Sequence, residues 1–155
     1  MRYPKAAEPL NAVKVGIAAG AAGTAAMTAA QMAYYKATRS QPSNVPVQVV
    51  RRIGSGVLHR DLPPPQGGVD TVLNNAMHWI YGTSWGALFG LAAAGRRPGA
   101  SIVFGLVVWG ASLVHLPAMK LAPPVWEQDP ETIAPDVGFH LLYGTATAAA
   151  YRAMR

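Results

Sequence analysis

The stretch ASIVFGLVVWGASLVHLPAMK, residues 100–120, decides the fold class of this chain. It carries no Asp, Glu, Lys or Arg before Lys120, and it is long enough for an α-helix to cross the roughly 30 Å hydrocarbon core of a bilayer. Only 13% of the whole chain is charged, against about 25% in ordinary soluble domains. The stretch therefore predicts a membrane span.

Three further stretches have the composition of spans, at about 13–35, 70–94 and 136–154. The first consists mostly of Ala, Gly and Thr, small residues that suit closely packed membrane helices. The last is short and barely covers the bilayer core. We predict an all-α membrane protein with four transmembrane helices, in a single domain of residues 1–155.

The connection at 36–69 is predicted to hold a short amphipathic helix at 44–58. Its apolar residues recur at helical spacing, and two arginines lie opposite them: Val47, Val50, Ile53 and Val57, with Arg51 and Arg52. This pattern favours a helix lying in the membrane interface, and an irregular loop is the alternative. Three prolines at 63–65 are expected to end it.

Glycines in the second span predict close helix packing. Gly82, Gly86 and Gly90 are spaced four residues apart and form a smooth ridge for another helix. In addition, HWIYGT at 78–83 and HLLYGT at 140–145 share the pattern His-x-x-Tyr-Gly-Thr. This match predicts that the four spans form two repeated αα hairpins, related by an axis along the membrane normal.

The charged residues indicate contact with lipid. The net charge of +6 arises largely from basic residues that flank the apolar stretches, which favours lipid phosphates over nucleic acid as their partner. The Arg96-Arg97 turn and the basic C-terminal tail favour cytoplasmic termini. The chain has no cysteine, which excludes disulfides and thiolate metal sites.

Ionisable residues inside spans are costly and are expected to face the bundle interior. His78, His115 and His140 lie within or at the ends of spans, and Asp136 lies one turn before His140. With helices that alternate in direction, all four residues fall in the same outer half of the bundle. Asp70 and Asn74 share a helical face with His78.

This set of side chains is open to several interpretations. Three imidazoles and a carboxylate could bind a divalent transition metal, with the carboxylates as ligands or as partners that orient the imidazoles. A haem between His78 and His140 is a further possibility, because Gly82 and Gly144 lie one turn away and would leave room for it. The remaining alternatives are a proton-responsive cluster and a hydrogen-bonded network that only holds the helices together.

Three elements of the C-terminal half are VHLP at 114–117, LAPPVW at 121–126, and Asp136 followed by FHL at 139–141. Through them the chain resembles the YagU-like family of bacterial inner-membrane proteins, whose function is uncharacterised. Phe139 replaces the glycine of the family pattern, and the first half is much less alike. The resemblance implies an inner-membrane location with cytoplasmic termini and a link to acid tolerance, and it assigns no catalytic residue.

No P-loop, dinucleotide fingerprint or HExxH motif is present, so an enzymatic role is not favoured. The predicted function is that of a small inner-membrane protein whose outer His/Asp site binds a transition metal or responds to protons. The alternative is an accessory structural subunit of a larger membrane complex, suggested by the glycine ridge and the small size of the chain. A transporter would need a homo-oligomer, for which the same ridge is a candidate surface. A membrane-embedded metal hydrolase is a third possibility.

Overall fold

The computed structural model describes residues 7–59, 67–92 and 100–155, and these residues form helices without any strand. The long helices are α1 (Ala7–Thr38), α3 (Gly67–Leu91), α4 (Ala100–Ala118) and α5 (Pro130–Ala153), and the shorter elements are α2 (Val45–Leu58) and a 3₁₀ turn (Val125–Glu127). The predicted all-helical class is confirmed, and the helix expected at 44–58 is present as α2. The predicted basic turn at 95–99 and the prolines at 63–65 lie outside the described residues.

The fourth long helix begins earlier than the sequence predicted. We expected it to start at 136, after Pro135, but α5 starts at Pro130 and continues through Pro135. A proline lacks a backbone N–H, and near the start of a helix this removes at most one intrahelical hydrogen bond. The prediction of a short fourth helix was therefore wrong, because α5 is 24 residues long.

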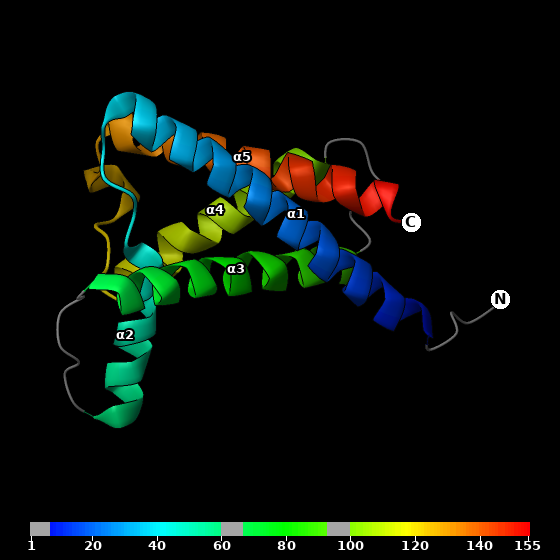
Figure 1. Cartoon of the computed structure of the whole chain (residues 1–155), viewed down its shortest axis with the longest axis horizontal. Coiled ribbons are helices and arrows are strands. Elements are labelled where there is room, and N and C mark those ends of the chain that lie inside the picture. The colour runs from blue at the N-terminus through cyan, green and yellow to red at the C-terminus, as the bar shows by residue number, and fades with distance from the viewer. Residues whose placement is uncertain (1–6, 60–66, 93–99) are drawn as a thin grey trace.

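The long helices form a bundle in which neighbours run in opposite directions (Figure 1). α1 packs between α3 and α5, and α4 packs against α5 while crossing obliquely toward the start of α3. The start of α1 and the end of α5 lie at the same end of the bundle. α2 packs against α3 at the opposite end and projects across the axis of the bundle.

The glycine ridge of α3 packs against α1 of the same chain. A Cβ atom added to Gly20 would lie 2.8 Å from the Cα atom of Gly86, and one added to Gly90 would lie 3.1 Å from the Cα atom of Gly16. Gly82 meets the side chain of Thr24. The ridge is thus covered within the chain and is not a free surface for a second subunit.

α4 and α5 meet through glycines in a similar way. A Cβ atom added to Gly144 would lie 2.8 Å from the Cα atom of Gly105. The glycines of the two His-x-x-Tyr-Gly-Thr motifs, Gly82 and Gly144, therefore each face the long helix that precedes their own. The internal repeat itself stays a prediction.

Aromatic side chains fill the centre of the bundle. The ring centroid of Phe89 lies 4.6 Å from that of Phe104 and 5.5 Å from that of Tyr151. The hydroxyl of Tyr143 donates to the carbonyl oxygen of Gly82 at 2.6 Å, and that of Tyr151 donates to the carbonyl oxygen of Gly90 at 3.2 Å. These side chains join α3, α4 and α5 in one core.

Two helices of the described residues are long and apolar enough to cross a membrane, over Pro9–Thr38 in α1 and Ser101–Ala118 in α4. By the same measure of length and hydropathy, α3 and α5 do not qualify. Only 17% of the residues in Ser101–Ala118 are buried inside the molecule, whereas the core helix of a soluble protein is mostly buried. The finding is weak support for a membrane protein, and the four-span arrangement stays a proposal.

Candidate functional site

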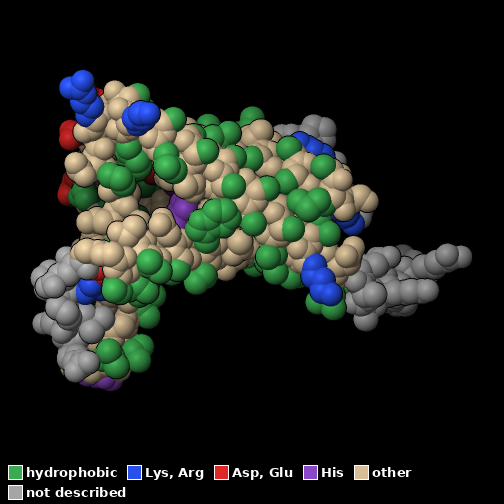
Figure 2. Space-filling view, viewed as in Figure 1, with side chains coloured by type: hydrophobic (Ala, Val, Ile, Leu, Met, Phe, Trp, Pro, Cys, Tyr) green, Lys and Arg blue, Asp and Glu red, His purple; other side chains and the backbone are tan. Residues whose placement is uncertain are grey.

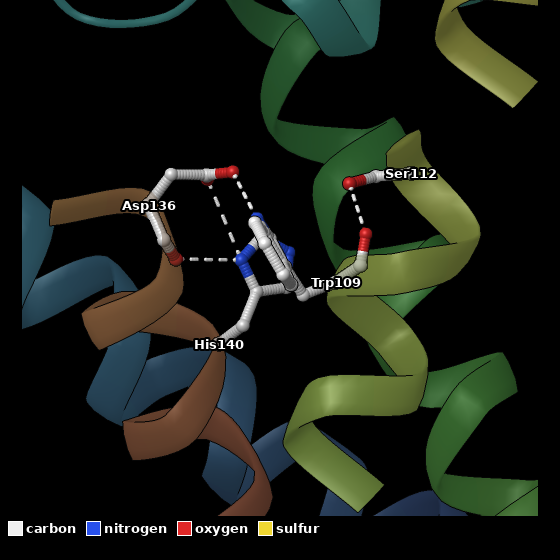
Figure 3. Close-up of polar contacts among 4 residues, drawn as sticks. All are labelled: Trp109, Ser112, Asp136 and His140. Atoms are coloured by element: carbon white, nitrogen blue, oxygen red, sulfur yellow. Dashed lines mark hydrogen bonds and ion pairs between the residues drawn. The ribbon is translucent and has the colours of Figure 1, made fainter. Parts of the chain in front are cut away.

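The residues that carry the site come from α4 and α5, where the two helices run side by side (Figure 3). The indole Nε1–H of Trp109 donates a hydrogen bond of 2.9 Å to the Oδ2 atom of Asp136. The side chain of Asp136 is 44% exposed, while that of His140 is only 11% exposed. A carboxylate at the surface of the bundle thus lies beside a partly buried imidazole.

The contacts of His140 fix which of its ring nitrogens carries the hydrogen. Its Nδ1 atom lies 2.8 Å from the backbone carbonyl oxygen of Asp136 and 3.4 Å from the carboxylate Oδ1 atom of the same residue. A carbonyl oxygen can only accept, so Nδ1 donates. The Nε2 atom of a ring protonated on Nδ1 alone then holds the free lone pair.

His115 makes the same kind of contact on α4. Its Nδ1 atom lies 2.7 Å from the carbonyl oxygen of Ala111, and its ring centroid lies 5.8 Å from that of Tyr81 on α3. His115 therefore faces α3, while the carboxylate of Asp136 is bound by Trp109.

His78 lies on α3, near His140. Its Nε2 atom is buried and has no hydrogen-bond partner among the described residues. The ring is close enough to His140 for the charges of the two imidazoles to interact. Thr28 on α1 also has a buried hydroxyl with no such partner.

The structure thus brings two of the four predicted site residues into contact with each other. Asp136 and His140 are in contact, His78 is near His140, and His115 packs on Tyr81. Within residues 7–59, 67–92 and 100–155, no three His, Asp or Glu side chains are grouped as ligands of one metal ion would be. The metal site stays a prediction from the sequence.

The space expected for a haem is filled. Gly82 and Gly144 were predicted to leave room for a macrocycle between His78 and His140. Instead, Gly82 is covered by Thr24 and Gly144 by the backbone of Gly105. The residues present do not fit a haem at this position.

Asp70 and Asn74 hold α2 rather than the histidines. The buried carboxylate of Asp70 forms an ion pair with Arg51 of α2. The side-chain oxygen of Asn74 accepts the backbone N–H of Val47 at 3.0 Å, and its amide donates to the carbonyl oxygen of Ser43 at 3.1 Å. These contacts of Asp70 and Asn74 with α2 and the residues before it are called the clamp on α2 below. The sequence offered a signal for the clamp, because a buried carboxylate needs a cationic partner and Arg51 lies in the neighbouring helix.

Trp109 is a site residue that the sequence analysis did not single out. The signal lies in the register of the two helices. Gly105 meets Gly144 in an antiparallel pair, so Trp109, one turn after Gly105, falls level with the turn that contains Asp136 and His140.

Comparison of the chain with protein-family models, with curated proteins and with solved structures finds no match. The YagU-like resemblance stays a prediction from the motifs of the C-terminal half.

Proposed function

We propose that this chain is a small multi-pass protein of the bacterial inner membrane that senses protons. In this proposal α1, α3, α4 and α5 cross the bilayer, α2 lies in the interface, and both termini are cytoplasmic. The unit formed by Trp109, Asp136 and His140, called the α4–α5 site below, takes up the proton.

The distribution of side chains supports lipid as the solvent. The outward side chains of α4 are large and apolar: Ile102, Val103, Leu106, Val107 and Val114. Polar Thr24 and Thr147 are instead buried at helix contacts. Figure 2 shows Lys, Arg, Asp and Glu gathered toward the two ends of the bundle, with a middle zone that lacks them. A soluble bundle has the opposite arrangement, with apolar faces inside and charged residues outside.

α3 fits the same arrangement although its mean hydropathy is lower. Its polar residues Asp70 and Asn74 are engaged with α2. Its outward face carries Val69, Val72, Ile80, Leu88 and Leu91. A polar side chain that is paired inside the protein lowers the hydropathy of the sequence without being exposed to lipid.

The exposed apolar side chains in the second half of α2 support a position in the interface. Val47 and Val49 are buried, while Ile53, Val57 and Leu58 are exposed. The helix lies across the end of the bundle (Figure 1), and an amphipathic helix in this orientation can lay its free apolar face into the headgroup region.

The observation that carries the proton-sensing function is the exposed carboxylate of Asp136 between an indole donor and a partly buried imidazole. Imidazole is the side chain whose charge ordinarily changes between pH 5 and 8. A proton on Nε2 of His140 makes the ring cationic, and the adjacent carboxylate stabilises that cation. The electrostatic attraction between the protonated imidazole of His140 and the carboxylate of Asp136 then changes the hydrogen bond between that carboxylate and Trp109.

The test is histidine NMR of ¹⁵N-labelled protein in lipid nanodiscs. The signals are assigned with single substitutions at His59, His78, His115 and His140. We expect the His140 signals to shift between pH 5 and 8, and Asp136→Asn to change that response because the adjacent carboxylate is removed. His140 signals that stay constant over this range would contradict the proposal.

A metal ion is the second candidate ligand of the same site. The Nδ1 contact of His140 leaves its Nε2 atom with a free lone pair, which is the form that binds zinc or a related metal. Elemental analysis of purified protein, with His140→Ala as the matched variant, tests it. Stoichiometric metal lost in the variant supports a metal site, and equal, near-zero metal in both proteins removes it.

A further inference from the structure

Between the charged ends of the described bundle, the histidines and Asp136 lie in one half, while Lys14 of α1 and Arg152 of α5 lie at the end opposite α2. His78, His115, Asp136 and His140 lie in the halves of their helices nearer to α2. The remaining parts of α1, α3, α4 and α5, at 15–35, 79–91, 100–114 and 141–151, contain no Asp, Glu, His, Lys or Arg. Their only ionisable side chains are tyrosines.

An aromatic layer closes the bundle beyond the α4–α5 site. Phe89, Phe104, Tyr143 and Tyr151 are all buried, and neighbouring rings in this layer lie 4.6–5.7 Å apart. The hydroxyls of Tyr143 and Tyr151 are held by the carbonyl oxygens of Gly82 and Gly90. No acidic or basic side chain lies within this layer to pass a proton on.

The glycine contacts close the route between α1 and α3. The backbones of Gly16 and Gly20 touch those of Gly90 and Gly86, so the two helices have no gap there for a file of water molecules. Proton transfer over such a distance needs a chain of hydrogen-bonded groups or waters, and buried water needs polar partners.

We infer that the α4–α5 site exchanges protons with one compartment only, the one at the α2 end, and that the chain does not conduct protons across the membrane. This inference rests on the proposed proton-sensing function. The site is then a one-sided sensor, which separates it from a channel or a proton-coupled transporter.

The side chains that face the site from the neighbouring helices lie in the same half of the bundle as the site. Tyr35 of α1 interacts electrostatically with Asp136, and His78 of α3 interacts with His140. From α4 the contact is Trp109, which does not titrate.

The experiment follows Trp109 fluorescence in sealed vesicles while the pH of one side is changed. Trp79→Phe, Trp85→Phe and Trp126→Phe leave Trp109 as the only tryptophan. Because the chain lacks cysteine, Asp129→Cys at the α2 end supplies a unique thiol, and Asp129 makes no side-chain capping hydrogen bond. Labelling with a membrane-impermeant maleimide then measures the fraction of molecules whose α2 end faces outward.

We expect an external pH step from 8 to 5 to change the emission only of those molecules whose α2 end faces outward. The emission change, as a share of the full change, should therefore equal the share of molecules labelled by the maleimide. A protonophore should then release the rest, and Asp136→Asn should reduce the change. The one-sided inference would be overturned if the share of the emission change equalled the share of unlabelled molecules. A full emission change before the protonophore is added would also overturn it. No change even with the protonophore would instead overturn the proton-sensing function beneath it.

A flux measurement tests the second half of the inference without any substitution. Vesicles containing the wild-type chain and an internal pH dye should acidify no faster than protein-free vesicles after the same pH step. Acidification that increases with the amount of protein would overturn it.

Discussion

Asp136 contacts side chains on two helices, and the sequence pattern predicts only the contact within its own helix. Its carboxylate accepts the indole N–H of Trp109 and lies beside the imidazole of His140, and its backbone carbonyl accepts the Nδ1–H of the same ring. The spacing of Asp136 and His140 was sufficient to predict that they share a helical face. It could not reveal that Trp109 competes for the carboxylate, because that depends on the register of α4 against α5.

Two substitutions at Asp136 separate its charge from its hydrogen bond. Asp136→Asn keeps an acceptor for Trp109, so the thermal unfolding midpoint in detergent should change little. Asp136→Ala leaves the indole N–H without its partner, which should cost roughly 1 kcal/mol of stability. Circular dichroism melts of both variants make the comparison. Equal destabilisation would mean that the charge, and not the hydrogen bond, holds α4 to α5 there.

Hydrogen bonds to the backbone explain why the described histidines are not grouped around one metal ion. The Nδ1 atoms of His115 and His140 are each bound to a carbonyl one turn earlier in their own helix, which fixes the direction of the ring. Helical spacing predicts the depth of a side chain well and its rotation about the helix axis less well. The predicted grouping of these residues around one ion depends on how each helix is rotated against its neighbours, which the spacing within one helix does not give.

At the scale of elements, small residues set how closely the helices approach. The ridge in α3 could be predicted from its four-residue spacing, but its partner could equally have been another subunit. The structure assigns it to Gly16 and Gly20 of α1. The start of α5 could not be predicted, because Pro135 reads as a helix boundary and is tolerated near a helix start.

Gly20→Ala tests the α1–α3 contact. The added methyl group would lie 2.8 Å from the Cα atom of Gly86, so the helices must move apart, at a cost of about 1–3 kcal/mol. Gly110→Ala is the matched control, because a Cβ atom there meets nothing within 4 Å. Its higher helix propensity should leave stability unchanged or slightly raised. A lowered melting midpoint for Gly110→Ala and not for Gly20→Ala would contradict the packing account.

The clamp on α2 gives a prediction that is local to one element. Asn74→Ala removes the acceptor for the N–H of Val47 and the donor to Ser43, so hydrogen exchange at the start of α2 should accelerate. The exposed neighbour Asn75→Ala serves as the control. Exchange in α1 and α5 should be unaltered in both variants. Acceleration throughout the bundle would show that α2 is not a separate unit.

For the whole molecule, the choice of solvent decides how every other feature is interpreted. Paired polar groups inside and apolar side chains outside stabilise a bundle in lipid and would promote aggregation in water. The apolar stretch at 100–120 was enough to predict this solvent for α4. For α3 and α5 the sequence alone is weaker, because Asp70, Asn74 and Asp136 lower their hydropathy and only the structure shows which partners they have.

Cysteine accessibility in sealed native membranes tests the four-span claim most directly, at Ile80 on the outward face of α3. Ile80 is 59% exposed, and the chain has no other cysteine to interfere. We expect Ile80→Cys to resist a membrane-impermeant maleimide until the membrane is dissolved in denaturing detergent, while Asp129→Cys at the bundle end reacts from one side of the intact membrane. Ile80→Cys reacting as fast as Asp129→Cys in sealed membranes would mean that water, not lipid, surrounds α3, and would contradict the account.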